Sequence, residues 1–251
     1  MKRPAKPVPW LMAGEDFPAI NSAWGADDPA PGLLAAGGVL DTHSLKRAYR
    51  EGIFPWFSLG QPILWWSPNP RMVLLTRDFK LHKSLKKTLQ RFLENPNCNL
   101  TFDTSFDQVI SACANATRDG QSGTWIVPDM MAAYSDLHKA GHAHSVETWV
   151  NGKLVGGLYC VSLGGMVFGE SMFSRQSDAS KIALSGLVAF CKAKDISMID
   201  CQQNTQHLSS FGAHEIDRES FAAHVIEQTG RANPEWVFET NYWNEILTVH
   251  T

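Results

Sequence analysis

The alternation of apolar and polar positions is clearest between residues 145 and 174, where it predicts an antiparallel meander. Asn151-Gly152 is a type I′ hairpin signal, and Gly164-Gly165 turn the chain a second time. The strands that these turns separate are expected over residues 145–150, 154–162 and 166–173.

Helical spacing of apolar residues is found on both sides of this meander. A helix should start at Ser177 or Asp178 and run to about Lys194, ahead of a strand over residues 196–201. An earlier helix should be capped by Thr42 or Ser44 and end at Gly52, and a last one should be capped by Asp217 and run through Ile226. Other helices are expected over 79–92 and 106–114 and from Pro128 to about 140. A meander followed by a helix and a further strand predicts an α+β fold.

The first part of the chain has a different composition. Residues 1–40 are rich in Pro, Gly and Ala, and two aromatic segments over 53–57 and 63–66 predict a hairpin. The stretch Ser67-Pro68-Asn69-Pro70-Arg71 interrupts the pattern. We therefore expect a small N-terminal α/β domain over residues 1–70 and a larger domain over residues 71–251.

Composition excludes several classes of protein. The 251 residues are 44% hydrophobic and 19% charged, as in a globular protein, and no apolar run approaches the roughly 20 residues of a membrane span. Five cysteines without a CxxC pair indicate neither a disulfide framework nor a zinc knuckle. Reduced thiols fit a cytoplasmic location, and a net charge of -3 argues against a protein that coats nucleic acid generally.

One predicted helix is nevertheless basic. Its cations occupy the side opposite the apolar face, and residues 79–92 contain no acidic residue. They are Lys80, Lys83, Lys86, Lys87 and Arg91. Such a surface can follow a phosphate backbone, with each contact releasing counterions, or it can simply be a solvated helix face.

Two carboxylates stand inside runs that otherwise predict buried strands. Glu170 lies within residues 168–174 and Asp200 within residues 198–202. A buried carboxylate is unfavourable unless it is paired or hydrogen-bonded, so each taken alone is best explained by a cap or an ion pair. Two of them at strands that flank one helix, with Ser171 and Gln202 beside them, favour a reaction centre.

Other kinds of site are weaker. A predicted helix end separates His138 from His142 and His144, so a metal site is not expected. Cys201 with His207 as its base would make a thiol nucleophile, but Cys201 is expected on the opposite strand face from the neighbouring polar residues, which favours a buried cysteine. The sequence contains no P-loop and no dinucleotide fingerprint.

Several long motifs occur in a consistent order between Phe17 and Phe221. They are Pro31 to Gly38, Ala48 to Ser58, Trp65 to Arg71, Gly123 to Ile126, Ala143 to Glu147, Leu154 to Tyr159, Gly169 to Ser174 and Ile199 to Gln202. These motifs resemble the leucyl/phenylalanyl-tRNA–protein transferase family.

This resemblance implies an acetyltransferase-like (GNAT-like) domain behind the small N-terminal one. It implies transfer of Leu, Phe or Met from aminoacyl-tRNA to proteins that begin with Arg or Lys, which marks them for degradation. The pyrophosphate loop of ordinary acetyltransferases is missing, so neither coenzyme A nor another cofactor is expected. The expected partners are therefore aminoacyl-tRNA and acceptor proteins, without DNA or a membrane.

The resemblance also implies roles for individual residues. Tyr49, Trp56 and Trp125 match aromatics near the aminoacyl-adenosine end, where stacking on adenine contributes about 1–3 kcal/mol. The residues that match an apolar amino-acid pocket are Leu158, Val167, Leu184, Leu187 and Ile199. The basic helix is placed on the tRNA acceptor stem.

The implied reaction is aminolysis of the aminoacyl ester by an α-amine, which titrates near 8 and is partly neutral at cytoplasmic pH. Catalysis then needs orientation and a late proton acceptor. We expect Gln202 to orient the amine, Asp200 to supply negative charge and Glu170 to help hold the cationic substrate. An acyl-CoA N-acyltransferase and a non-catalytic binder of tRNA or basic N-termini remain as alternatives.

Overall fold

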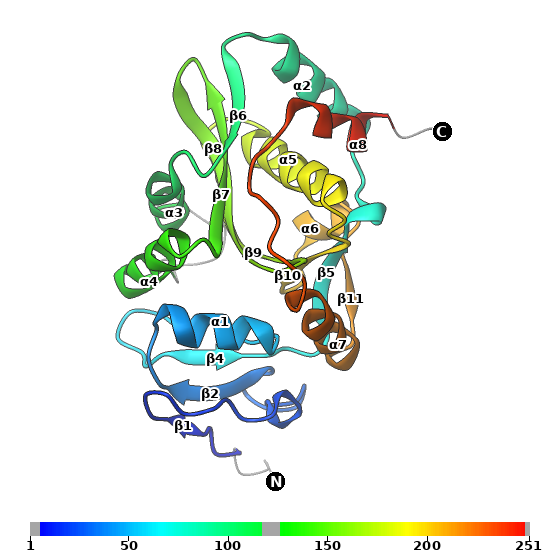
Figure 1. Ribbon diagram of the computed structural model, residues 1–251. Helices are drawn as coiled ribbons and strands as arrows, with labels where there is room; N and C mark the ends of the chain where they lie inside the picture. The colour runs from blue at the N-terminus through cyan, green and yellow to red at the C-terminus, as the bar shows by residue number, and fades with distance from the viewer. Residues whose placement is uncertain (1–5, 117–125, 249–251) are drawn as a thin grey trace.

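The computed structural model describes residues 6–116 and 126–248, and two sheets organise this part of the chain. The first has four strands in the order β1-β2-β4-β3, and the second has seven in the order β11-β5-β10-β9-β8-β7-β6. In Figure 1 the small sheet and helix α1 lie at the bottom, with the large sheet and its helices above them.

The small sheet confirms the predicted aromatic hairpin, because β3 and β4 pair antiparallel. Its elements are β1 (Trp10–Leu11), η1 (Ile20–Ser22), β2 (Leu33–Gly37), α1 (Thr42–Arg50), β3 (Phe54–Pro55) and β4 (Leu64–Trp66). The prediction of Thr42 or Ser44 as the helix cap is wrong. The cap is Asp41, whose extended backbone lets its carboxylate accept a hydrogen bond from the Ser44 N–H at 2.7 Å.

The large sheet contains the predicted meander and the predicted later strand. Its strands are β5 (Arg71–Leu75), β6 (Cys98–Phe102), β7 (Ala143–Val150), β8 (Lys153–Leu163), β9 (Met166–Ser174), β10 (Met198–Gln202) and β11 (His214–Ile216). Strands β6 to β9 are antiparallel, whereas β10 runs parallel to β9 after the crossover helix α5 (Ala179–Ala193). The α+β prediction is confirmed. The change of sheet falls between Trp66 and Arg71, and the division into two domains at residue 70 stays a prediction.

The remaining helices surround this sheet. They are η2 (Thr76–Asp78), α2 (Lys83–Glu94), α3 (Phe106–Ala114), α4 (Pro128–Lys139), α6 (Gln206–Ser210), α7 (Arg218–Thr229), η3 (Thr240–Trp243) and α8 (Asn244–Leu247). The predicted helix over 79–92 thus starts later, at Lys83. Phe79 instead stacks on Phe211 at 5.9 Å, and the Lys80 N–H donates to the Phe211 carbonyl, which keeps this segment extended.

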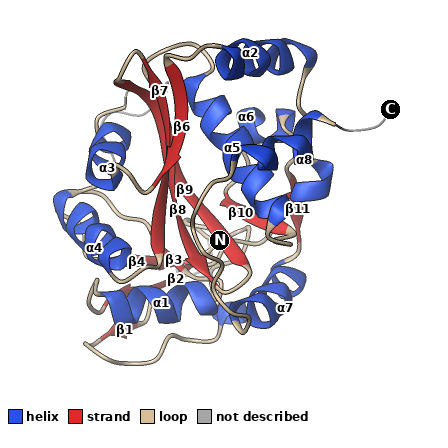
Figure 2. Ribbon diagram, turned by 45° about the horizontal axis from the view of Figure 1, so that its top comes forward, coloured by secondary structure: helices blue, strands red, loops and turns tan. Residues whose placement is uncertain are grey.

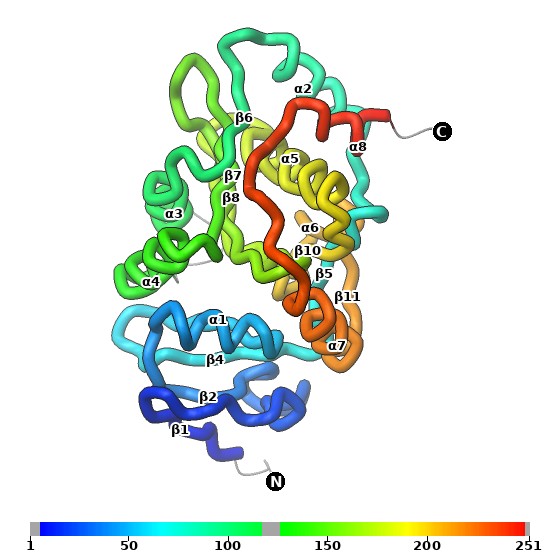
Figure 3. The backbone as a smooth tube through the Cα atoms, in the orientation of Figure 1, coloured from blue at the N-terminus to red at the C-terminus, as the bar shows by residue number. Residues whose placement is uncertain are grey.

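The helix capped by Asp217 exists, but it is not the last one. The chain continues from α7 along α5 to η3 and α8, as Figure 3 traces. In this stretch Trp236 packs on Phe190 of α5, with 4.7 Å between the ring centroids.

Alternate residues of the central strands contribute to two apolar clusters. Tyr159 and Val161 of β8 pack with α3 and α4, whereas Leu158 and Cys160 pack with α5. Figure 2 shows α3 and α4 on one side of these strands and α5 on the other. Within residues 6–116 and 126–248, no helix has both the length and the apolar character that crossing a membrane requires.

Candidate active site

The site lies where two neighbouring strands separate. Strands β9 and β10 are paired only at Val167 with Ile199 and at Phe168 with Asp200. Beyond these pairs β9 continues along β8, while β10 ends in a bulge. A cavity of about 820 Å³ opens between the diverging strands, and β3, α5 and α6 complete its walls.

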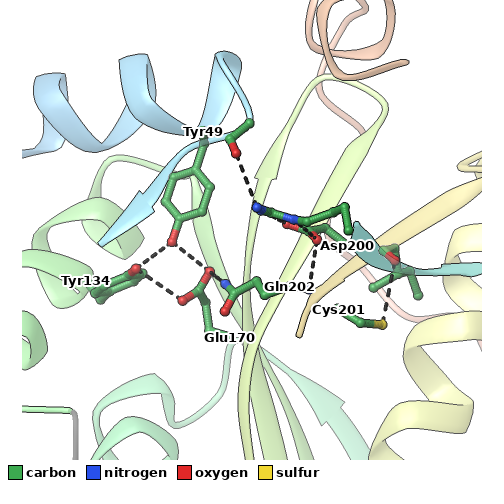
Figure 4. Close-up of polar contacts among 9 residues, drawn as sticks. Tyr49, Tyr134, Glu170, Asp200, Cys201 and Gln202 are labelled. Atoms are coloured by element: carbon green, nitrogen blue, oxygen red, sulfur yellow. Dashed lines mark hydrogen bonds and ion pairs between the residues drawn. The ribbon is translucent and has the colours of Figure 1, made fainter. Parts of the chain in front are cut away.

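Glu170 lies at the centre of the polar wall, where three side chains donate hydrogen bonds to it (Figure 4). The Tyr49 hydroxyl donates to Oε1 at 2.6 Å, and the Tyr134 hydroxyl donates to Oε2 at 3.1 Å. The third donor is Nε2 of Gln202, at 3.0 Å from Oε1. A carboxylate offers about four acceptor positions, so this arrangement leaves room for a further donor from a substrate.

Burial raises the pKa of Glu170 from 4.5 to about 7, because desolvation disfavours the charged form. The hydrogen bonds from Tyr49, Tyr134 and Gln202 oppose this rise, whereas the nearby charge of Asp200 adds to it. Burial and the charge of Glu170 in turn raise the pKa of both tyrosines well above 10. At neutral pH the site therefore contains two neutral phenols and a carboxyl group that is close to half ionised.

Asp200 is in a different situation from the one expected. It is fully buried, and Arg71 binds both of its oxygens: Nε donates to Oδ1 at 2.8 Å and Nη2 donates to Oδ2 at 2.6 Å. The Gln202 N–H also donates to Oδ1, at 2.9 Å. The expectation that Asp200 supplies negative charge to a substrate amine stays a prediction, and the ion pair with Arg71 compensates part of that charge.

The bulge at the end of β10 determines where Gln202 points. Asp200 pairs with Val73 and Gln202 with the next residue, Met72, so Cys201 is the extra residue. Gln202 adopts a φ of 60°, which is unfavourable for a residue with a side chain. This conformation brings its amide to Glu170, where Nε2 faces the carboxylate because carboxylate oxygens accept hydrogen bonds.

The thiol alternative finds no support in this arrangement. Burial raises the pKa of the Cys201 thiol, with a further rise from the charge of Asp200, so the thiolate form is disfavoured. Cys201 and His207 both line the cavity, and no hydrogen bond joins them within the described residues.

An apolar wall faces the polar one. Of the five residues that the resemblance assigned to an amino-acid pocket, four line the cavity: Leu158, Leu184, Leu187 and Ile199. Val167 does not, because it pairs with Ile199 where β9 and β10 are still joined and is fully buried in the α5 cluster. Further apolar residues that were not predicted also line the cavity: Phe54, Pro55, Met172 and Leu208.

The three aromatic residues differ in placement. Tyr49 is fully buried, with its ring 4.9 Å from that of Phe168, so no ring face is exposed for stacking on adenine. What Tyr49 supplies is its hydroxyl group. Trp56 lines the cavity, and its ring centroid lies 5.3 Å from that of Trp66. Trp125 lies outside the described residues.

The basic residues are not all equivalent. Lys83, Lys87 and Arg91 are exposed on α2, and Lys80 is exposed in the extended segment before it. Lys86 is half-buried and donates to the Leu247 carbonyl at the end of α8, at 3.0 Å. Lys86 therefore also holds the C-terminal segment, and this bond uses one of the three donors of its ammonium group.

Two residues of the site do not stand out from the sequence patterns. Arg71 falls in the break between the two expected domains, and Tyr134 occupies one position of an apolar helix face. A signal exists for each: a charged residue that opens an apolar strand, and a tyrosine whose hydroxyl requires a partner when buried.

No group of His, Cys, Asp and Glu suited to a metal ion occurs among the described residues. Two of the three histidines considered for this role have other partners, whereas Nδ1 of the third, His142, is buried without a hydrogen-bond partner in the described part of the chain. His144 is hydrogen-bonded to Asp103 at 2.7 Å, and Nδ1 of His138 to the Ala143 carbonyl at 2.8 Å.

Comparison with known proteins gives the class of enzyme. Residues 38–69 match a family model described as the leucyl/phenylalanyl-tRNA protein transferase N-terminal domain, and residues 73–226 match the model of the leucyl/phenylalanyl-tRNA protein transferase itself. The second match covers the cavity walls formed by β8, β9, α5, β10 and α6, and the first covers β3. Together these matches identify the chain as an aminoacyltransferase.

Two relatives identify the family within this class of enzyme. The chain is 65% identical over 243 residues to the leucyl/phenylalanyl-tRNA–protein transferase of Polaromonas sp. strain JS666, covering 97% of this chain and 95% of that protein. It is 59% identical over 242 residues to the transferase of the same name from Albidiferax ferrireducens, covering 96% and 95%. The chain belongs to the leucyl/phenylalanyl-tRNA–protein transferase family, as its motifs implied.

Among solved structures, a GCN5-related N-acetyltransferase from Kribbella flavida can be superimposed on this chain. The alignment covers 65% of this chain and 56% of the acetyltransferase, at 9% sequence identity and a TM-score of 0.33. A likeness so distant says nothing about chemistry.

Proposed function

We propose that this enzyme moves leucine or phenylalanine, and also methionine, from aminoacyl-tRNA to the N-terminal Arg or Lys of acceptor proteins, and that it does so in the cytoplasm. One observation carries the proposal: a single cavity has an apolar wall on one side and the Glu170–Gln202 pair on the other. The apolar wall suits a Leu, Phe or Met side chain, since polar side chains would lose solvation there. The polar wall suits a cationic acceptor.

The acceptor amine approaches the ester carbonyl from the polar side of the cavity. Nε2 of Gln202 is bonded to Glu170, so the amide oxygen is the atom that remains to accept a hydrogen bond from the amine. This contact orients the nitrogen lone pair toward the carbonyl carbon, which is the kind of positioning on which aminolysis depends.

Glu170 both attracts the cationic acceptor and takes up the proton that the amine releases. A pKa of about 7 matches this task, because a base works best when its pKa lies near the operating pH. As the C–N bond forms and the ester C–O bond breaks, the amine loses a proton to Glu170 and the tRNA ribose oxygen leaves. Glu170 then gives this proton to the leaving ribose oxygen, and the neighbouring ribose hydroxyl group provides a second route by passing a proton from the amine to that oxygen.

The tRNA lies along the basic segment that begins beside the cavity. Phe79 and His82 both contact the end of α6, whose residues His207 and Leu208 line the cavity. The exposed cations follow this contact along the chain, and they can neutralise acceptor-stem phosphates. They are Lys80, Lys83, Lys87 and Arg91. Trp56 at the cavity wall is left to stack on the terminal adenine.

One assay tests the proposal. Leu-tRNA with labelled leucine is mixed with a peptide that begins with Arg and, as the control, with the same peptide beginning with Ala. We expect label in the Arg peptide alone. Acylation of the Arg peptide from acyl-CoA, without transfer from Leu-tRNA, would instead identify an acyl-CoA N-acyltransferase. Binding of both partners without transfer would identify a non-catalytic binder.

A further inference from the structure

Arg71 occupies an unusual place for an arginine. It is 1% exposed, and its guanidinium lies between two phenyl rings, 4.7 Å from the ring centroid of Phe54 and 4.6 Å from that of Phe221. Nη1 donates to the Gly52 carbonyl at 3.3 Å. One buried cation thus joins β3 and the segment before it, β5 and α7.

The other two nitrogens of this guanidinium, Nε and Nη2, each donate to Asp200, which makes a two-point hydrogen-bonded ion pair. The planar fork of arginine matches a carboxylate in a way that lysine does not. Asp200, held by Arg71, also accepts a hydrogen bond from the Gln202 N–H. That bond spans the bulge in which Gln202 has its positive φ. The hydrogen bonds therefore run in series from Arg71 to Asp200, then to Gln202 and finally to Glu170.

We propose that Arg71 is a positioning residue for the transfer reaction: acting through Asp200, it holds Gln202 in the strained conformation that presents its amide to Glu170 and to the substrate amine. This inference rests on the proposed function for its kinetic effect, although the placement of Gln202 is independent of any substrate. In this arrangement Asp200 takes no proton from the amine. It is fully buried, and its carboxylate is held as an ion pair by Arg71.

The kinetic test uses the full chain and the labelled Leu-tRNA assay with the Arg peptide. Arg71→Lys keeps the positive charge but loses the fork, so kcat should fall by about 10- to 100-fold, with KM for Leu-tRNA little changed. Adding Asp200→Asn to Arg71→Lys should lower kcat little further, because the two residues act as one unit. The rising limb of kcat against pH should persist in each variant, since the titrating group is Glu170, and Asp200→Asn should move it to lower pH because the charge of Asp200 raises the pKa of Glu170.

Phe221→Leu provides a variant that leaves the ion pair itself intact. It removes one of the two rings that contact the Arg71 guanidinium. It should therefore lower kcat, but by less than Arg71→Lys does. Val225→Ala, a buried residue on the same helix α7, is its matched control: it loosens the packing of α7, and kcat should stay at the wild-type value. Thermal unfolding confirms that the variants being compared are folded.

A spectroscopic measurement tests the placement without a substrate. The side-chain amide resonance of Gln202, assigned by its loss in Gln202→Glu, should move in Arg71→Lys and in Phe221→Leu but not in Val225→Ala. An unmoved resonance, an unchanged kcat in Arg71→Lys, or loss of the rising limb of the pH profile on Asp200→Asn would each overturn the inference. A wild-type enzyme that transfers no leucine would overturn the proposed function instead, with the resonance still deciding the role of Arg71.

Discussion

The hydroxyl oxygens of Tyr49 and Tyr134 lie 2.5 Å apart, although the two residues come from different helices, α1 and α4. Each phenol has one proton, and Tyr49 donates its proton to Glu170. Tyr134 then divides its proton between the Tyr49 oxygen and Oε2 of Glu170. Hydrogen bonds from α1 and α4 thus act together on the pKa of Glu170.

Tyr134→Phe should therefore shift the pH dependence of transfer. The hydrogen bond from Tyr134 lowers the pKa of Glu170, so its removal raises that pKa above its value of about 7. If Glu170 acts as the base, the rising limb of kcat against pH moves to higher pH, and the rate at pH 7 falls while the rate at pH 9 recovers. Tyr49→Phe should shift the limb further, because its hydrogen bond has the larger effect on the pKa. A limb that stays in place would separate Glu170 from the proton transfer.

The ionisation of Glu170 also predicts how stability changes with pH. The pKa of Glu170 is about 7 when the protein is folded and 4.5 in its ordinary state, so the folded form binds more protons between these values. Its contribution to stability is therefore present below about pH 4.5 and is lost as the pH rises through 7.

Glu170→Gln removes this titration. Across the same pH range the wild type should lose about 3 kcal/mol in the free energy of unfolding relative to the variant. Urea unfolding of both proteins at pH 5, 6, 7 and 8 measures the difference, and other titrating groups cancel in the comparison. Parallel stability curves would contradict the raised pKa. In the transfer assay the same variant should lose about 100-fold or more in kcat, together with the rising limb of the pH profile.

The sequence patterns predict the sheet and most helices because local spacing determines them. The meander from β7 to β9 follows from period-two alternation and two turn signals. The predicted start of α2 is wrong, since the stacking of Phe79 on the distant Phe211 overrides the helical spacing.

The candidate site likewise contains residues that the sequence predicts and residues that it does not. Glu170 and Gln202 stand out as polar residues at predicted strand ends, and the structure brings them into contact. The partner of Asp200 is not visible in the sequence, because Arg71 lies 129 residues away and meets it only through the pairing of β5 with β10. The bulge at Cys201 has no local signal either, and it directs the side chain of Gln202.

Selectivity for the transferred amino acid should depend on the cavity wall and not on the residues behind it. Leu187→Ala removes apolar volume from the wall, so transfer of Phe should gain over transfer of Leu by about 1–3 kcal/mol, or roughly 10- to 200-fold in kcat/KM. Val167→Ala removes buried volume behind the wall and should lower stability without changing that ratio. Competition between Leu-tRNA and Phe-tRNA for one peptide measures the ratio. A change in Val167→Ala as large as in Leu187→Ala would restore Val167 to the pocket.

Binding of tRNA should weaken when two exposed lysines of α2 are reversed in charge. In Lys83→Glu with Lys87→Glu, affinity should fall, because two phosphates of the tRNA are no longer neutralised. The slope of log K against log salt should become flatter by about 2, or about 1 for each of these phosphates.

Lys139→Glu with Lys153→Glu changes the net charge equally at exposed positions away from α2, and it should leave most of that slope in place. Lys86→Glu has a second expected effect, because the Lys86 ammonium is bonded to the Leu247 carbonyl. It should lower the melting temperature as well as the affinity. Filter binding of Leu-tRNA over a series of salt concentrations measures the slopes, and equal slopes in the two double variants would remove α2 from the tRNA interface.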